Sequence, residues 1–289
     1  MNLTDKFLEL IKNELTIFGM QDFSGFDNTQ IIAMNMNLKS KMINNKVYEI
    51  FESPQVIEKI NNLNNNYLLA FDEIKTKLQN GEDVNPFLSK QAVKPKFNDY
   101  LLLDWGIHHF HLNKSNSGNY FNDRSDYLLI ARIKDDKVYF IDIEHHDNSE
   151  VFVKQEYLKI ILDNWSDILK PYEFTGKLSY SPSNDEIKKL RKNQINSSIQ
   201  IKDKFYMPMG GGITTSGDGE QHIIGAMQIL KYIKHLEEHC KNNLEVILND
   251  IENKVGKRFS SLDLDFIYQN RELMLIDKNS NLILAPIKV

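Results

Sequence analysis

Histidines are concentrated in one short part of this chain. Five of the eight lie between residues 108 and 146, and these five are His108, His109, His111, His145 and His146. Free imidazole changes its charge near pH ~6.5, so a pair of histidines can act as general base and general acid at neutral pH. The sequence therefore points first to proton-transfer chemistry in this stretch.

The segment Tyr100–Leu112, YLLLDWGIHHFHL, is apolar and aromatic, and we predict that it is rich in β-structure. Because alternate residues of a strand face the same side, His109 and His111 should share one face and His108 should lie on the other. Arg132 lies on the next predicted strand, and Glu144 ends the third. If the strands pair in chain order, imidazoles, a guanidinium and a carboxylate converge at one end of the sheet.

Acid–base catalysis is the leading interpretation of these residues. We predict His109 as one catalytic group, with His111 or His145 as its partner. Arg132 would stabilise the charge that develops on phosphorus, and Arg124 is an alternative for that role. This is the set of groups needed to cleave RNA through its own 2′-hydroxyl without a metal. The plainer alternative is that the histidines fill positions in the sheet and hydrogen-bond locally.

A metal site is a further alternative, because His109 and His111 form an H-x-H pair on a predicted strand. A third ligand would have to come from the end of the third strand, from His145, His146 or Asp142. Asp142 and Glu144 also keep open a metal-dependent nuclease of the carboxylate type. However, no lysine follows Glu144 at the spacing of a PD-x-E-x-K motif. The leading interpretation requires no cofactor.

A glycine-rich loop and a basic run are candidate phosphate-binding segments. Glycine permits a close approach of the backbone, and the helix expected after the loop would offer free N–H groups. The predicted phosphate contacts are Gly210, Gly211, Gly212, Thr214, Thr215 and Ser216 in the loop, with Lys188, Lys189, Arg191 and Lys192 before it. The loop matches neither a Walker A motif nor a dinucleotide fingerprint. The alternative is a flexible turn, a capped helix and a solvated basic surface.

Three strands and a helix are expected to position the histidines. Residues 127–133 and 138–143 form a predicted hairpin, joined by a tight polar turn. With residues 100–112 they make an antiparallel meander. Residues 154–169 have apolar side chains at helical spacing and end before Pro171, which predicts an amphipathic helix.

The whole chain is predicted to have an α+β fold. Residues 1–95 form a mostly helical part, and residues 96–206 form the histidine-rich antiparallel sheet core with packed helices. Residues 207–289 contain the glycine-rich loop, a long helix over 220–254 and a terminal β-hairpin that turns at 278–281. We expect this last part to form one compact unit with the core.

The order of these elements resembles the core of the RelE-type toxins, a branch of the barnase–EndoU–colicin–RelE ribonucleases. The stretches that carry the resemblance are YLLLDWGIHHFHL, DYLLIARIKDD and KVYFIDIEHH with the helix after them, about a quarter of the chain. The resemblance implies an endoribonuclease that acts as a bacterial toxin or a phage-defence effector. Members of that family are small and usually basic, whereas this chain is neither.

Composition narrows the class of protein. The formal net charge is −5, and the sequence pI is about 5.9, which argues against a protein that coats nucleic acid by overall charge. A single cysteine, Cys240, excludes an intrachain disulfide and a cysteine-rich zinc module. No run approaches the ~18 apolar residues of a membrane helix, and the N-terminus carries acids unlike a signal peptide. We therefore expect a cytoplasmic protein with no membrane partner.

The leading prediction is a metal-independent endoribonuclease whose partner is RNA, with an antitoxin or another protein as a possible regulator. The first alternative is a non-enzymatic interaction module that binds a protein through its aromatic, histidine-rich sheet face. In that case the long helix from Glu220 would serve as the seam of a homo-oligomer. The second alternative is a histidine-ligated, metal-dependent nuclease or hydrolase.

Overall fold

The computed structural model describes residues 2–269 and 272–287, and the chain is an α+β protein, as predicted. It divides into two compact units. Residues 37–221 form the larger unit, and residues 1–36 with residues 222–289 form the smaller one. This division differs from the three predicted segments, because the C-terminal strands pack with the N-terminal helix instead of with the histidine-rich sheet.

The larger unit is organised around a four-stranded sheet in the order β1-β4-β3-β2. The strands are β1 Glu49–Glu52, β2 Ile107–His111, β3 Tyr127–Lys134 and β4 Lys137–His145. The last three form the predicted antiparallel meander, whereas β1 pairs with β4 in parallel. The sequence did not predict β1, because its four residues, EIFE, do not alternate between apolar and polar side chains.

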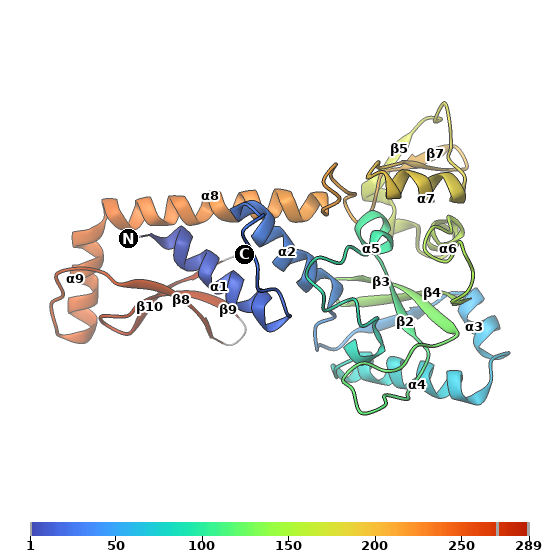
Figure 1. Cartoon of the computed structure of the whole chain (residues 1–289), viewed down its shortest axis with the longest axis horizontal. Coiled ribbons are helices and arrows are strands. Elements are labelled where there is room, and N and C mark those ends of the chain that lie inside the picture. The colour runs from blue at the N-terminus through green and yellow to red at the C-terminus, as the bar shows by residue number, and fades with distance from the viewer. Residues whose placement is uncertain (1, 270–271, 288–289) are drawn as a thin grey trace. The chain divides into compact units, whose positions relative to one another are not determined.

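Helices cover both faces of this sheet (Figure 1). α3 (Pro54–Ile60) and α4 (Asn65–Asn80) cover one face, and α6 (Glu156–Trp165) covers the other. The α6 face presents Ile107, Leu128, Ile130 and Ile141. The α4 face presents Phe110, Leu129, Ala131 and Phe140. Burying each of the larger side chains in these two sets stabilises the fold by roughly 1.5–3 kcal/mol, so the strand alternation is firmly fixed.

The first half of the segment predicted as a strand is a helix, α5 (Tyr100–Trp105). Asp99 caps its N-terminus by accepting hydrogen bonds from the backbone N–H groups of Leu101 and Leu102. Gly106 ends it in the left-handed conformation at φ 64°, which glycine adopts without strain. An apolar run of this length suits either element, and the two flanking residues decide in favour of a helix.

The rest of the larger unit contains short elements. A second sheet has the order β5-β7-β6, with β5 Glu173–Thr175, β6 Ile199–Ile201 and β7 Lys204–Tyr206. α7 (Asn184–Lys192) begins in a capping box between Ser183 and Glu186. Single 3-10 turns occupy Asn85–Phe87, Ser166–Ile168 and Lys170–Tyr172. The last two show that α6 ends earlier than the predicted helix over 154–169.

The smaller unit pairs helices with a three-stranded antiparallel sheet in the order β10-β9-β8. Its elements are α1 Leu3–Ile17, most of α2 Asn28–Lys41, α8 Glu220–Asn242, α9 Leu244–Val255, β8 Leu264–Gln269, β9 Glu272–Asp277 and β10 Leu282–Ile287. The predicted long helix is therefore two helices that part at Asn243. The predicted terminal hairpin is confirmed and gains β8 as a third strand. No helix in the described part of the chain has the length and apolar character needed to cross a membrane.

Candidate active site

Strand register fixes the sides on which the histidines of β2 lie. His109 lies opposite Ile130 of β3, and His111 lies opposite Leu128. Both partners belong to the core beneath α6, so the two histidines share the α6 face, as predicted. His108 lies on the opposite face, where its Nε2 is 3.3 Å from the carbonyl oxygen of Ser40.

A third histidine, His146, joins this pair after β4 has ended. Its ring stacks on that of His111, with centroids 5.7 Å apart and planes inclined by 22°, and the His111 and His109 centroids are 6.1 Å apart. The Nη2 atom of Arg124 lies 3.1 Å from Nε2 of His146. The ring of Phe152 lies 5.2 Å from that of His109 and 6.3 Å from that of His146. We call these five residues the histidine cluster.

His145 lies on the other side of the sheet. It pairs with Tyr127 in the register of β3 and β4, and its ring packs edge-on against that tyrosine at 5.1 Å. Tyr127 in turn contacts Tyr67 of α4 at 4.9 Å. The prediction that His145 acts beside His109, or completes a metal site with His109 and His111, therefore has no geometric support. The alternation of side chains that places His109 and His111 on one face of the sheet places His145 on the other.

Arg132 is also separated from the cluster, although it lies on the same sheet face. Its guanidinium is buried and donates to the carbonyl oxygens of Trp105 at 2.6 Å and Gly106 at 3.3 Å. It therefore ties the C-terminal end of α5 to β3. A Cβ atom at Gly106 would lie 2.3 Å from this guanidinium, so a larger residue there would displace the arginine side chain. Arg124, the alternative for the charge-stabilising role, is exposed and lies in the cluster.

His111 is a buried, neutral member of the cluster. Burial and the neighbouring positive groups of His109, His146 and Arg124 lower its pKa to about 3. Its Nδ1 accepts a long hydrogen bond, 3.4 Å, from the backbone N–H of Ser125. At neutral pH its single ring proton therefore lies on Nε2.

His146 has a pKa lowered by burial and by the charge of Arg124. Because the guanidinium of Arg124 can only donate, Nε2 of His146 accepts the hydrogen bond between them. His109 differs from both, because its Nδ1 faces a carboxylate oxygen, Oδ2 of Asp99, at 3.6 Å. Its Nε2 forms no hydrogen bond with any described residue and, unlike Nδ1, is not shielded from solvent.

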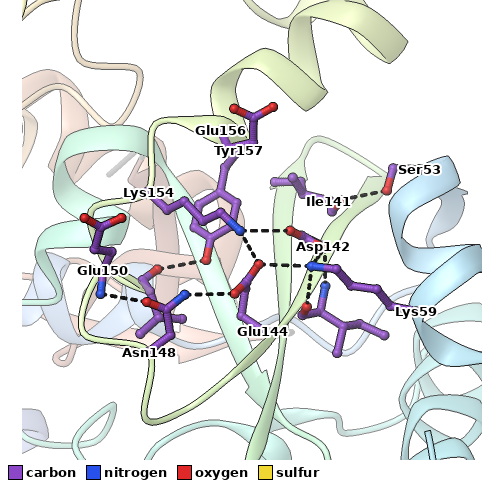
Figure 2. A network of polar contacts seen from close by, with 12 residues as sticks. Ser53, Lys59, Ile141, Asp142, Glu144, Asn148, Glu150, Lys154, Glu156 and Tyr157 are labelled. Carbon is purple, nitrogen blue, oxygen red and sulfur yellow. Dashed lines mark hydrogen bonds and ion pairs between the residues drawn. The ribbon is translucent and has the colours of Figure 1, made fainter. Parts of the chain in front are cut away.

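A second polar group lies on the same sheet face, along β4. Figure 2 shows Lys59 and Lys154 approaching the carboxylates of Asp142 and Glu144 from opposite sides. The Lys59 ammonium lies 2.7 Å from Asp142 and 3.0 Å from Glu144, and it also donates to the carbonyl oxygen of Ile143 at 2.9 Å. Lys154 bonds Glu144 and lies 3.7 Å from Asp142. We call the four charged residues the carboxylate–lysine network.

The two carboxyl groups of this network differ in the direction of their pKa shifts. The side chains of Asp142 and Glu144 are only 3% and 8% exposed, and burial alone would raise the pKa of each. Hydrogen bonds from Lys154, Asp142 and Lys59 outweigh burial at Glu144 and lower its pKa to about 2. For Asp142 burial dominates, so its pKa stays raised. A PD-x-E-x-K motif would have placed a lysine two residues after Glu144. Here the lysines beside the carboxylates are Lys59 of α3 and Lys154 of the turn before α6.

The carboxylate–lysine network does not resemble an open metal site. Both carboxylates are already held by ammonium groups, and Glu144 also accepts from the side chain of Asn148 at 3.1 Å. Across residues 2–269 and 272–287, no group of three or more histidine, cysteine, aspartate or glutamate side chains is placed to hold a metal ion. The network instead ties α3 and the segment before α6 to the central strand.

The glycine-rich loop packs against the end of α5. Gly210 and Gly212 donate their N–H groups to the carbonyl oxygens of Asp104 and Leu103, each at 2.9 Å. A Cβ atom on Gly210 would lie 2.2 Å from the carbonyl oxygen of Leu102. The N–H of Gly211 bonds Pro208, so the three glycine donors predicted to bind phosphate all have internal acceptors. The loop therefore closes the C-terminus of a helix, whose last carbonyls lack partners within it.

The other predicted phosphate contacts are similarly divided. Thr214 bonds the carbonyl of Asp218 and Ser216 bonds its carboxylate, whereas Thr215 is exposed. Lys188, Lys189 and Lys192 are exposed on α7. Arg191 is buried, bonds Asp104 at 2.8 Å and lies 4.3 Å above the ring of Trp105.

Arg191 also contributes indirectly to the histidine cluster, because it donates to the carbonyl oxygen of Phe152. The two neighbours of Phe152, Val151 and Val153, are buried in the core, whereas the phenylalanine ring itself is 38% exposed. A large apolar ring is thus held at the surface beside His109 and His146.

No family model, curated protein or solved structure matches this chain. The candidate site therefore stands on its own geometry. The sequence placed His109 and His111 together, and it offered Arg124 and His146 as alternatives. It gave no signal for Asp99, which precedes a segment predicted to be rich in β-structure, or for Phe152, a single aromatic residue between two valines.

Proposed function

We propose that this chain is an endoribonuclease that cleaves RNA by histidine acid–base chemistry, with the histidine cluster as its active site. One observation carries the proposal. Two partly exposed imidazoles, His109 and His146, lie around the exposed ring of Phe152 beside an exposed guanidinium, that of Arg124. Imidazoles supply proton transfer, the guanidinium supplies charge stabilisation, and the ring supplies a face on which a base can stack.

In the proposed reaction, Nε2 of His109 takes the proton of a ribose 2′-hydroxyl. The 2′-oxygen then forms a bond to the adjacent phosphorus, and Arg124 stabilises the charge on the phosphoryl oxygens. The bond from phosphorus to the 5′-oxygen breaks. A bound phosphate beside Arg124 favours the protonated form of His146, which gives its proton to the leaving oxygen. The products are a 2′,3′-cyclic phosphate and a 5′-hydroxyl.

The remaining histidine of this face has a supporting role. His111 is neutral at physiological pH and contacts both other rings, stacked on that of His146 and edge-on to that of His109. A neutral residue at this position keeps two proton-transferring groups close together without adding a third positive charge. RNA is thus the proposed partner of the cluster.

The test is cleavage of a mixed-sequence RNA by the purified full chain in excess EDTA, read on a denaturing gel. The wild-type chain should produce cyclic-phosphate ends, and His109→Ala should lower the rate by roughly 10²–10⁴-fold. His145→Ala is the matched control, because it removes a neighbouring histidine from the opposite face and should leave the rate unchanged. Full activity in His109→Ala, loss of activity in EDTA, or no cleavage by the wild-type chain would contradict the proposal.

A further inference from the structure

We propose that Asp99 is the positioning residue of His109: in the neutral imidazole it favours the tautomer that carries the ring proton on Nδ1, so that Nε2 is the proton acceptor. This inference rests on the proposed function, since it concerns the residue to which that function assigns the first proton transfer. It adds a residue that lies outside the histidine cluster, on the segment that leads into α5.

The two carboxylate oxygens of Asp99 have separate partners. Oδ1 accepts hydrogen bonds from the N–H groups of Leu101 and Leu102, at 3.1 and 3.3 Å. Oδ2 faces Nδ1 of His109 at 3.6 Å, just beyond hydrogen-bond distance, and this buried nitrogen has no hydrogen-bond partner among the described residues. Because two backbone donors fix one oxygen, the direction of the other is fixed as well. The N-cap of α5 therefore also aims a carboxylate at the strand that follows the helix.

The contact is sheltered from solvent. The side chains of His109 and Asp99 are 11% and 16% exposed, and both line a small cavity of about 20 Å³ at the outer edge of β2. Apolar side chains, those of Leu88, Ala92, Phe97 and Leu102, form much of its wall. In such surroundings an interaction between a carboxylate and an N–H group is stronger than in water.

Two other basic side chains, Lys41 and His108, lie within the electrostatic range of Asp99 but form their hydrogen bonds elsewhere. Lys41 lines the same cavity, but its ammonium donates to the carbonyl oxygens of Lys94 and Phe97 at 2.8 and 2.6 Å. His108 points to the other face and bonds Ser40. Within the described residues, His109 is the titratable side chain whose nitrogen lies within 4.0 Å of the Asp99 carboxylate.

The consequence for catalysis follows from hydrogen-bond chemistry. An ionised carboxylate accepts hydrogen bonds and cannot donate them, so a neutral His109 is most stable with its proton on Nδ1. The lone pair is then on Nε2, the nitrogen that solvent reaches. A histidine in the opposite form would present a proton to the 2′-hydroxyl and could not act as its base.

Two variants separate this role from the capping role. Asp99→Asn keeps a good N-cap, but its amide group can now donate to Nδ1 and so favours the opposite form of His109. Asp99→Ser also keeps a good cap and removes the contact altogether. Both should melt close to the wild-type temperature, which confirms that α5 is retained.

The first readout is the position of the ring proton, measured by ¹⁵N NMR of labelled full-length protein at neutral pH. Wild-type His109 should carry its proton on Nδ1, and in Asp99→Asn the proton should move to Nε2. The signal of His111 is an internal reference, because its Nδ1 accepts from Ser125 in every variant. A wild-type His109 with its proton on Nε2, or no change in Asp99→Asn, would overturn the inference.

The second readout is the rate of RNA cleavage. Asp99→Asn should lower it by roughly 10⁴-fold, as the wrong ring form does in aspartate–histidine hydrolases, and Asp99→Ser should lower it less. The NMR result stands without any activity. If the wild-type chain cleaves no RNA, the proposed function fails while the position of the proton still decides whether Asp99 orients His109.

Discussion

Two polar groups share the α6 face of one sheet, and they differ in how fully their members are paired. In the carboxylate–lysine network, two buried acids meet two ammonium groups, and every carboxylate has a charged partner within 3.0 Å. In the histidine cluster, Nε2 of His109 bonds no described residue, and Arg124 reaches solvent. A complete set of partners indicates a group that holds the fold, whereas unused donors and acceptors at a surface leave room for a substrate.

The largest expected effect is on stability and falls on the network. Glu144→Gln keeps the shape of the side chain but leaves Lys59 and Lys154 with one carboxylate between them. Because the carboxylate is 8% exposed while the lysines are 40% and 25% exposed, this change should cost up to about 3–5 kcal/mol, measured as the free energy of unfolding in urea. Glu156→Gln is the matched control, because its pair with Lys159 is exposed and is worth at most about 1 kcal/mol. Equal losses in the two variants would remove the distinction between the groups.

The next effect is on activity and falls on the histidine cluster. Arg124→Ala should lower RNA cleavage by roughly 10²–10³-fold, because the guanidinium would no longer stabilise the developing charge. Its free energy of unfolding should stay within about 0.5 kcal/mol of wild type, since the side chain is exposed. Lys114→Ala, in the same loop, is the control and should change neither quantity. A large loss of stability in Arg124→Ala would place this residue with the structural group.

A smaller effect is expected at Phe152. If a base stacks on its ring, Phe152→Ala should weaken the binding of single-stranded RNA by about 1–3 kcal/mol, measured by fluorescence anisotropy with non-cleavable 2′-deoxy or 2′-methoxy strands. Phe152→Tyr keeps the ring and should bind normally. Weakened binding by the tyrosine variant to the same extent would show that the ring is not a stacking surface.

The smallest effect distinguishes the two groups by their response to acid. His111 has an ordinary pKa of 6.5 that falls to about 3 on folding, so its contribution to stability is complete above pH 6.5 and is lost as the pH falls toward 3. Glu144, with a folded pKa of about 2, contributes fully above its ordinary value of 4.5 and loses that contribution between 4.5 and 2.

His111→Asn should therefore reduce the slope of unfolding free energy between pH 6.5 and 4.5 by up to about 1.4 kcal/mol per pH unit. Below pH 4.5 the part of the slope that comes from Glu144 should remain, because the network is intact, while the part that comes from His111 should be missing down to pH about 3. The measurement is urea unfolding at closely spaced pH values for both proteins. An unchanged slope above pH 4.5 would show that His111 is not held neutral in the folded chain.

The sequence predicted those features that depend on a short repeating pattern of side chains. Alternation along β2 correctly placed His109 and His111 on one face, and the turn between β3 and β4 was evident from its polar residues. The same alternation also indicates that Glu144 and His145 face opposite ways. What it cannot show is that the chain bends after β4 and brings His146 back to His111.

Contacts between distant residues were out of reach for a physical reason. Lys59 and Lys154 reach Asp142 and Glu144 because α3 and the segment before α6 both lie beside β4. The positions of these lysines in the sequence do not predict that proximity. Tyr100–Trp105 was misassigned because an apolar run has no period of its own, and only Asp99 and Gly106 mark it as a helix. The glycines of the 210–212 loop were predicted to bind phosphate. In the structure their N–H groups bond backbone carbonyl oxygens instead.

The closure of α5 by this loop has a consequence for the order in which the chain acquires its structure. The carbonyl oxygens of Leu103 and Asp104 obtain their partners from Gly212 and Gly210, roughly 100 residues further along the chain. A ribosome that adds 5–20 residues per second needs about 5–20 s to make that intervening segment. During this time the helix that carries the Asp99 cap lacks its C-terminal closure. His109 and His111 are therefore synthesised several seconds before the loop that bonds the last carbonyl oxygens of α5.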